Sequence, residues 1–221
     1  MLIDLSHPVT DGMPVWPGDP TVRLRPAARI PTAGYNLLAL ELGSQSGTHV
    51  DAPFHVGDDL PRLDELPLDR FVGPAVVADL RHLAAGAAIE TADLDPVRRQ
   101  LRPGAVLLLC TGWSRHWGTA EYANHPWLSP AAAQLVLDAG VRTIGIDAPS
   151  VDASIAGPPD LPTHRLLAQR HAVIAENLTN LDALPAQDSV PGTITVWLMP
   201  LALAGADGAP VRAVAQVREP G

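Results

Sequence analysis

Residues 45–55 (QSGTHVDAPFH) oppose a regular helix, and they hold a dense group of side chains that bind metals or carry protons. Gly47 and Pro53 both disfavour a helix, and Pro53 also pushes Ala52 toward an extended backbone. In an extended segment every second side chain points to the same face. The metal-binding or proton-carrying residues all have odd numbers: Gln45, His49, Asp51 and His55. The segment therefore predicts a strand with one strongly polar face.

A metal site within this segment requires a bend in the chain. Along a flat strand two residues span about 6.6 Å, so Gln45 and His49 would lie roughly 13 Å apart, whereas ligands of one ion each lie about 2 Å from it. We expect the bend at Gly47, because glycine adopts left-handed or bulged conformations without a steric penalty at Cβ. The alternative is a polar edge strand whose histidines only face water.

The remaining sequence predicts a single α/β domain covering residues 1–221. A chain of 221 residues with 47% apolar content can build one sizeable core. Short apolar runs that are typical of strands occupy residues 74–80, 105–110 and 141–147. Strands that alternate with helices favour the α/β class with a mixed sheet.

Two helices are expected between these strands. Ser129 is a good N-cap and Pro130 suits the first helical position, so a helix should run from there to the stop at Gly140. By the same rules a shorter helix should follow the N-cap Asp95 and end before Pro103.

Composition and charge exclude several classes of partner. A formal charge of −9 argues against nucleic acid and against an anionic membrane, since both select basic proteins. The single cysteine, Cys110, cannot form an internal disulfide and fits a reducing cytoplasm. The N-terminal residues do not read as a signal peptide, and no stretch is long enough to span a bilayer. We expect a cytoplasmic protein that acts on a small molecule.

Residues 47–55 resemble the signature of the bacterial kynurenine formamidase and cyclase family of metal-dependent hydrolases, which reads His-x-Gly-Thr-His-x-Asp-x-Pro-x-His. Residues 16–19 (WPGD), 147–152 (DAPSVD) and 200–214 are also similar to segments of that family, so the resemblance covers nearly the full length. It implies a mixed, partly barrel-like central sheet flanked by short helices, and a homodimer. Within the last segment, residues 206–209 predict a tight turn between two strands.

The resemblance also implies metal ligands and a proton carrier. In the family the first two histidines and the aspartate of the signature bind metal, and the last histidine handles protons. The corresponding residues here are Gln45, His49, Asp51 and His55. A later histidine and a glutamate twelve residues beyond it also belong to the family's site, and His164 and Glu176 have that separation.

Two positions depart from the family pattern. Gln45 replaces the first histidine, and because its amide oxygen is a neutral, harder donor, the site should bind zinc less tightly, prefer manganese or hold one ion. Thr163 stands where many members have a second histidine, and it is a candidate N-cap for a short helix that carries His164. Glu176 follows the apolar run 172–175, where a carboxylate needs a charged partner or an ion.

These residues predict a metal-dependent hydrolase that cleaves an amide bond of a small aromatic substrate. One or two zinc ions, with manganese as the alternative, would lower the pKa of a bound water and polarise the substrate carbonyl. A second ion would lie between Asp51, His164 and Glu176. His55 would take the water's proton and return it to the leaving nitrogen. The resemblance implies N-formylkynurenine, an intermediate of tryptophan catabolism, as the substrate, with Trp16 stacking on its ring unless Trp16 packs on the core.

Two other functions remain open at this stage. The same metal site could act on a different cyclic amide, imide, lactone or polyketide-like substrate, as the name of the broader cyclase family suggests. Alternatively, the protein binds a metal or small molecule without catalysis, having lost activity with the first histidine. The presence of His55 argues against the second alternative, because a binding protein needs no proton carrier.

Overall fold

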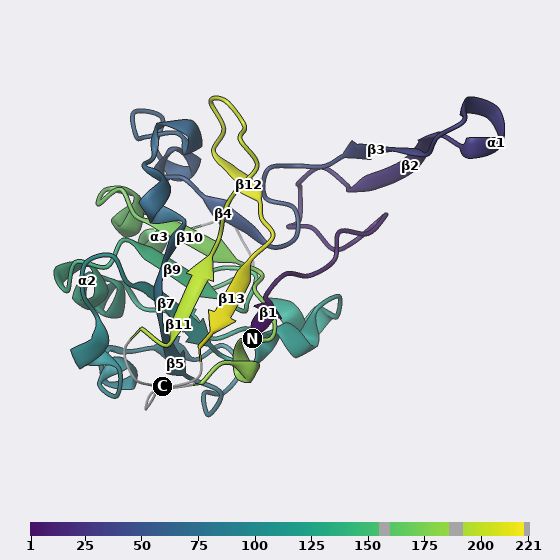
Figure 1. Ribbon diagram of the computed structural model, residues 1–221. Coiled ribbons are helices and arrows are strands. Elements are labelled where there is room, and N and C mark those ends of the chain that lie inside the picture. The colour runs from purple at the N-terminus through teal and green to yellow at the C-terminus, as the bar shows by residue number, and fades with distance from the viewer. Residues whose placement is uncertain (155–159, 186–191, 219–221) are drawn as a thin grey trace.

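The computed structural model describes residues 1–154, 160–185 and 192–218, and these form an α/β fold built around one large sheet (Figure 1). Within them the sheet contains nine strands in the order β1-β13-β11-β5-β7-β9-β10-β4-β12. Their bounds in that order are Leu2–Asp4, Val214–Val217, Ile194–Trp197, Val72–Asp79, Val106–Cys110, Thr143–Ile146, Val173–Glu176, His49–Asp51 and Gly208–Pro210. The helices are α1 (Ile30–Ala33), α2 (Pro130–Asp138) and α3 (Pro162–Ala168).

The sheet is mixed, as the sequence predicts. Strands β5, β7, β9 and β10 run parallel to one another, whereas the pairs on both sides of this block are antiparallel. The sheet curls into a partial barrel, with α2 and α3 packed along one side (Figure 1). Parallel strands buried on both faces need apolar residues at nearly every position, which explains the unbroken run VLLLC in β7.

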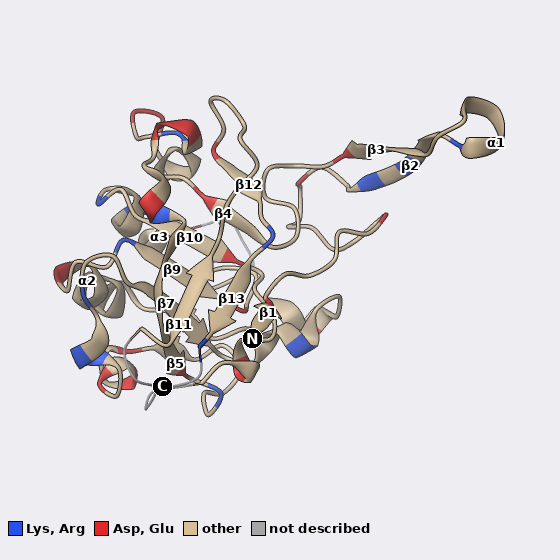
Figure 2. Cartoon of the chain, in the orientation of Figure 1, with Lys and Arg blue, Asp and Glu red and all other residues tan. Residues whose placement is uncertain are grey.

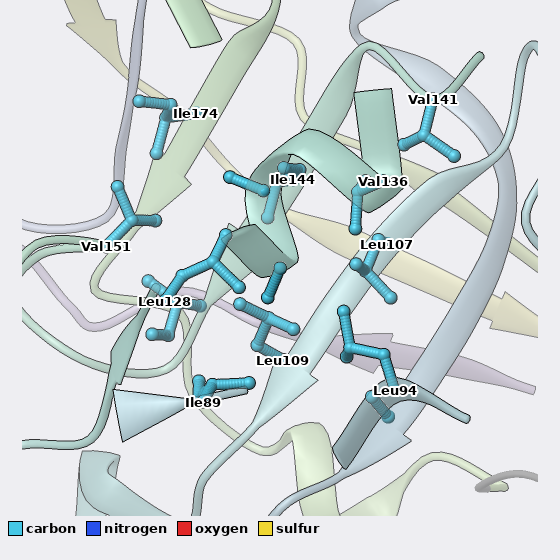
Figure 3. Packing of buried hydrophobic residues seen from close by; sticks show 14 of the residues in the cluster. Ile89, Leu94, Leu107, Leu109, Leu128, Val136, Val141, Ile144, Val151 and Ile174 are labelled. Carbon is cyan, nitrogen blue, oxygen red and sulfur yellow. The ribbon is translucent and has the colours of Figure 1, made fainter. Parts of the chain in front are cut away.

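The core consists of two hydrophobic clusters, one on each face of the sheet. Along β7, Leu107 and Leu109 belong to the cluster that includes Val136 of helix α2, and Leu108 belongs to the other cluster with Val50 of β4. Figure 3 shows the first cluster, in which Val136 faces the side chains of β7 and β9. Alternation of side chains across each strand therefore feeds both clusters.

Local sequence signals predict some elements correctly and fail for others. Helix α2 is confirmed, and the hydroxyl of its N-cap Ser129 accepts a hydrogen bond from the amide of Ala132. The helix expected after Asp95 is wrong, because only the 3₁₀ turn Arg98–Gln100 forms between Asp95 and Pro103. The tight turn expected at 206–209 is also wrong, since the chain turns at residues 204–205 and Gly208 already lies in β12.

Strands β2 (Arg23–Ala28) and β3 (Leu37–Glu41) form a hairpin that projects from the rest of the molecule and carries α1 at its tip (Figure 1). A second small sheet pairs β6 (Ala88–Ile89) with β8 (Trp127–Leu128). Figure 2 shows the basic residues scattered over several elements and not gathered on one face in this view. None of the described helices has the length and apolar character needed to cross a membrane.

Candidate metal centre

Pairing of β4 with β10 brings together three of the predicted ligands. His49 and Asp51 are two residues apart on β4, so their side chains share one face. In the antiparallel register Glu176 of β10 lies opposite His49. The chain bends before β4, where Gly47 has a φ of 68°, and this confirms the bend predicted from the sequence.

The four side chains of the centre form a closed arrangement. Nε2 of His49 lies 3.4 Å from Oδ1 of Asp51 and 3.5 Å from Oε2 of Glu176. Nε2 of His164, from helix α3, lies 3.7 Å from Oδ2 of Asp51 and 3.3 Å from Oε1 of Glu176. Each carboxylate thus presents one oxygen to each histidine. Ligands about 2.0–2.1 Å from a tetrahedral ion would be separated by similar distances.

The surroundings of Asp51 favour a cation at this centre. Both of its oxygens are buried, and neither has a hydrogen-bond partner within the described part of the chain. A buried carboxylate without hydrogen bonds is costly unless a positive charge compensates it. Burial alone would raise the pKa of Asp51, but the neighbouring His49 and His164 hold it well below its usual value.

The carboxylates also change the protonation of the histidines. Burial lowers the pKa of His49, but Asp51 and Glu176 outweigh this effect and raise it to about 10. The pKa of His164 is raised well above its usual value in the same way, against burial, by Asp152, Asp51 and Glu176. Both carboxylates therefore favour the protonated form of the two rings.

The second nitrogen of each ring is held by an acceptor outside the centre. Nδ1 of His49 donates to the Gly47 carbonyl at 2.8 Å, and Nδ1 of His164 donates to Oδ2 of Asp152 at 2.7 Å. These bonds leave Nε2 of both rings directed at the carboxylates, which is the arrangement typical of metal-binding histidines.

The Asp152 side chain also stabilises the N-terminal end of helix α3. Its carboxylate accepts the backbone N–H groups of Thr163 and His164, each at 2.9 Å. The prediction that Thr163 is the N-cap is wrong, because Leu161 occupies that position and the Thr163 hydroxyl donates to the Leu128 carbonyl. One buried carboxylate thus fixes both the helix start and the His164 ring.

His55 and Gln45 lie beside these four residues. His55 belongs to a 3₁₀ turn (Pro53–Val56), so the prediction that it continues the extended strand is wrong. Its ring centroid is 6.0 Å from that of His164. Nδ1 of His55 and Nε2 of Gln45 lie 3.2 and 2.8 Å from Oδ2 of Asp207. Burial lowers the pKa of His55, but the hydrogen bond to Asp207 raises it overall.

The remaining predicted residue, Trp16, is 39% exposed on its loop. Burial raises the pKa of Asp19 on the same loop, and the charges of His49 and His55 oppose this increase. A role for Trp16 in binding substrate stays a prediction. Asp152 and Asp207 were not predicted as site residues. Asp152 lies within a recognised motif, whereas nothing in the sequence places Asp207 beside His55.

Comparisons with known proteins identify the family of this chain. The family model Cyclase, described as "Putative cyclase", matches residues 3–153. The kynurenine formamidase of Salinibacter ruber is 35% identical over 217 residues, which is 96% of both chains. Isatin hydrolase A of Labrenzia aggregata has a TM-score of 0.87 at 26% identity, over 99% of this chain and 94% of that one. A structure described as a potential metal-dependent hydrolase with cyclase activity has a TM-score of 0.76 at 26% identity, covering 100% and 99%. The chain belongs to the cyclase family.

Proposed function

We propose that this protein is a metal-dependent hydrolase that cleaves the amide bond of N-formylkynurenine and releases kynurenine and formate. The observation that carries the proposal is the 35% identity with a kynurenine formamidase over nearly the whole of both chains. The buried group of His49, Asp51, Glu176 and His164 supports the proposal, because apolar residues of similar volume would often stabilise the fold as well as buried charged residues do.

The donor set fits a divalent cation. Imidazole nitrogens suit zinc, and carboxylate oxygens suit zinc or manganese, so we take zinc as the ion and manganese as the alternative. His49, Asp51 and Glu176 would hold one ion, and His164 would complete this site or share a second ion with the two carboxylates. When bound, a divalent ion lowers the pKa of water and polarises a substrate carbonyl.

His55 supplies the proton transfers of the reaction. Its Nδ1 is held by Asp207, so Nε2 is the atom available to accept the proton of the attacking water. The water oxygen forms a bond to the formyl carbon, and the C–N bond then breaks as His55 returns the proton to the leaving nitrogen. Trp16 is the aromatic side chain that we propose stacks on the aryl ring of the substrate.

A second candidate reaction is the opening of a cyclic amide. The similarity to isatin hydrolase A favours it, because that protein shares the fold over nearly the full length at 26% identity. The chemistry of the site would be the same, with water added to an amide carbonyl and the proton returned to nitrogen. Side-by-side measurement of kcat/KM for N-formylkynurenine and for isatin distinguishes the two. We expect the first to be at least about tenfold higher, and the reverse order would replace the proposed substrate.

The proposal includes a cytoplasmic homodimer. Cys110 is a buried free thiol, as expected in a reducing compartment. The projecting hairpin exposes Leu37, Leu38 and Leu40, and the adjacent Leu37 and Leu38 point to opposite faces. An isolated two-stranded hairpin with apolar residues on both faces is rarely stable alone, so a second copy of the chain is its expected partner.

Light scattering coupled to size exclusion tests the dimer. The wild-type protein should have the mass of two chains, and Leu38→Arg with Leu40→Arg should shift it toward one chain. The control is Leu68→Arg, because Leu68 is even more exposed than Leu38 and Leu40 but lies in a 3₁₀ turn of the main body. A monomeric wild-type protein would contradict this part of the proposal.

A further inference from the structure

The side chains of Gln45 and His55 meet at one carboxylate oxygen of Asp207, beside the metal centre. Oδ2 of Asp207 lies 2.8 Å from Nε2 of Gln45 and 3.2 Å from Nδ1 of His55. The backbone carbonyl of Asp207 accepts the Ala52 amide at 2.8 Å, directly after β4. Asp207 is therefore fixed by the β4–β12 pairing at the same place as its two side-chain partners.

The chemistry of the three side chains determines which of their atoms carry protons. The hydrogen bond from His55 holds the pKa of Asp207 below its usual value, although burial opposes this, so the carboxylate is ionised and only accepts. Both Nδ1–H of His55 and Nε2–H of Gln45 must then donate to it. Nε2 of Gln45 and Nδ1 of His55 lie 3.2 Å apart because both donate to the same oxygen, and they do not form a hydrogen bond with each other.

Asp207 also fixes the amide of Gln45. A flipped amide would place Oε1 against the carboxylate, so Nε2 must face Asp207 and Oε1 must face away. Gly208 provides the space for this amide, since a Cβ there would lie 2.7 Å from Nε2 of Gln45. Oε1 of Gln45 is buried and has no hydrogen-bond partner among the described residues.

We propose that Asp207 is the positioning residue of the proton carrier: it holds His55 with its proton on Nδ1 and holds the Gln45 amide with its nitrogen toward Asp207. The expected loss of kcat rests on the proposed function, whereas the expected tautomer of His55 does not. With Nδ1 occupied, Nε2 of His55 is the only ring atom that can take a proton during catalysis. In this proposal Asp207 acts through its contacts with His55 and Gln45.

Imidazole nitrogen NMR of the wild-type protein tests the structural part without any substrate. The neutral His55 ring should carry its proton on Nδ1, and Asp207→Asn should shift the ring toward a mixture of both tautomers. A wild-type ring protonated on Nε2 would overturn the inference even if the variant failed to fold. An absent turnover of N-formylkynurenine with the Nδ1 tautomer present would instead count against the proposed function.

Kinetics test whether Asp207 acts through His55. Asp207→Asn should lower kcat by about 100-fold, within the range of general acid–base catalysis, while KM and the zinc Kd stay within about twofold. In a His55→Ala background the same substitution should change kcat by less than about twofold. Asp58→Asn is the matched control, because Asp58 is an exposed carboxylate three residues from His55. Equal losses from Asp207→Asn in both backgrounds would show that Asp207 does not act through His55.

Discussion

Substitution of Asp152 by asparagine should weaken metal binding without removing a ligand. Oδ2 of Asp152 accepts from the backbone N–H and from Nδ1 of His164, and Oδ1 accepts from the Thr163 N–H. An asparagine has one acceptor oxygen, so at least one of these three buried donors loses its partner. The His164 ring also loses the negative charge that fixes its orientation.

The expected magnitudes follow from these bonds. Loss of a partner for one buried donor should lower the free energy of unfolding of the metal-stripped protein by about 1–3 kcal/mol. Loss of the carboxylate behind a ligand histidine typically weakens metal affinity by about 10- to 100-fold. That range corresponds to about 1.4–2.7 kcal/mol of binding free energy.

Competition with a chromogenic chelator measures the zinc Kd. Urea unfolding of the metal-stripped protein separately measures its free energy of unfolding. Asp160→Asn is the matched control, because Asp160 is an exposed carboxylate near the start of the same helix and pairs with the exposed Arg165. An Asp152→Asn protein that binds zinc as tightly as the control would refute the role given to Asp152.

Three further predictions follow from the same structure. Asp51 and Glu176 outweigh burial and raise the pKa of His49 to about 10, so the ring must release a proton to bind an ion and zinc affinity should rise with pH up to that value. Titration calorimetry in two buffers of different ionisation enthalpy should detect the released protons. Binding heats that do not depend on the buffer would contradict this prediction. Gly208→Ala should lower the free energy of unfolding in urea by about 1–3 kcal/mol, since a Cβ at this position would collide with the Val50 carbonyl and the Gln45 amide. Gly43→Ala is the control and should be nearly neutral, because a Cβ at Gly43 would lie 3.4 Å from its nearest neighbour. Gln45→His should tighten zinc binding in the chelator assay, because imidazole is a softer donor than an amide oxygen; an unchanged Kd would show that residue 45 is not a ligand.

Short-range signals in the sequence predict those parts of the molecule that local chemistry determines. Ser129 and Pro130 start α2 because the cap and the fixed proline φ act within one turn. Gly47 marks the bend before β4 for a similar reason, since glycine adopts its positive φ without strain.

Long-range pairing determines what the sequence does not reveal. Asp207 lies 152 residues from His55, and only the pairing of β12 with β4 brings them together. The segment after Asp95 has good helix signals, yet it forms only the 3₁₀ turn Arg98–Gln100, and Val97 and Leu101 on its two sides pack into the core. Tertiary packing overrides local propensity at that point.

The most direct test of the proposed function is formate release from N-formylkynurenine by metal-stripped protein, by the same protein reloaded with zinc or manganese, and by reloaded His55→Ala. The proposed function predicts no turnover without metal, turnover after reloading, and a loss of about 100-fold or more in His55→Ala. This variant should still bind zinc, because His55 lies outside the four proposed ligands. Equal formate release by stripped and reloaded protein, or full activity of His55→Ala, would contradict the proposed function of this centre.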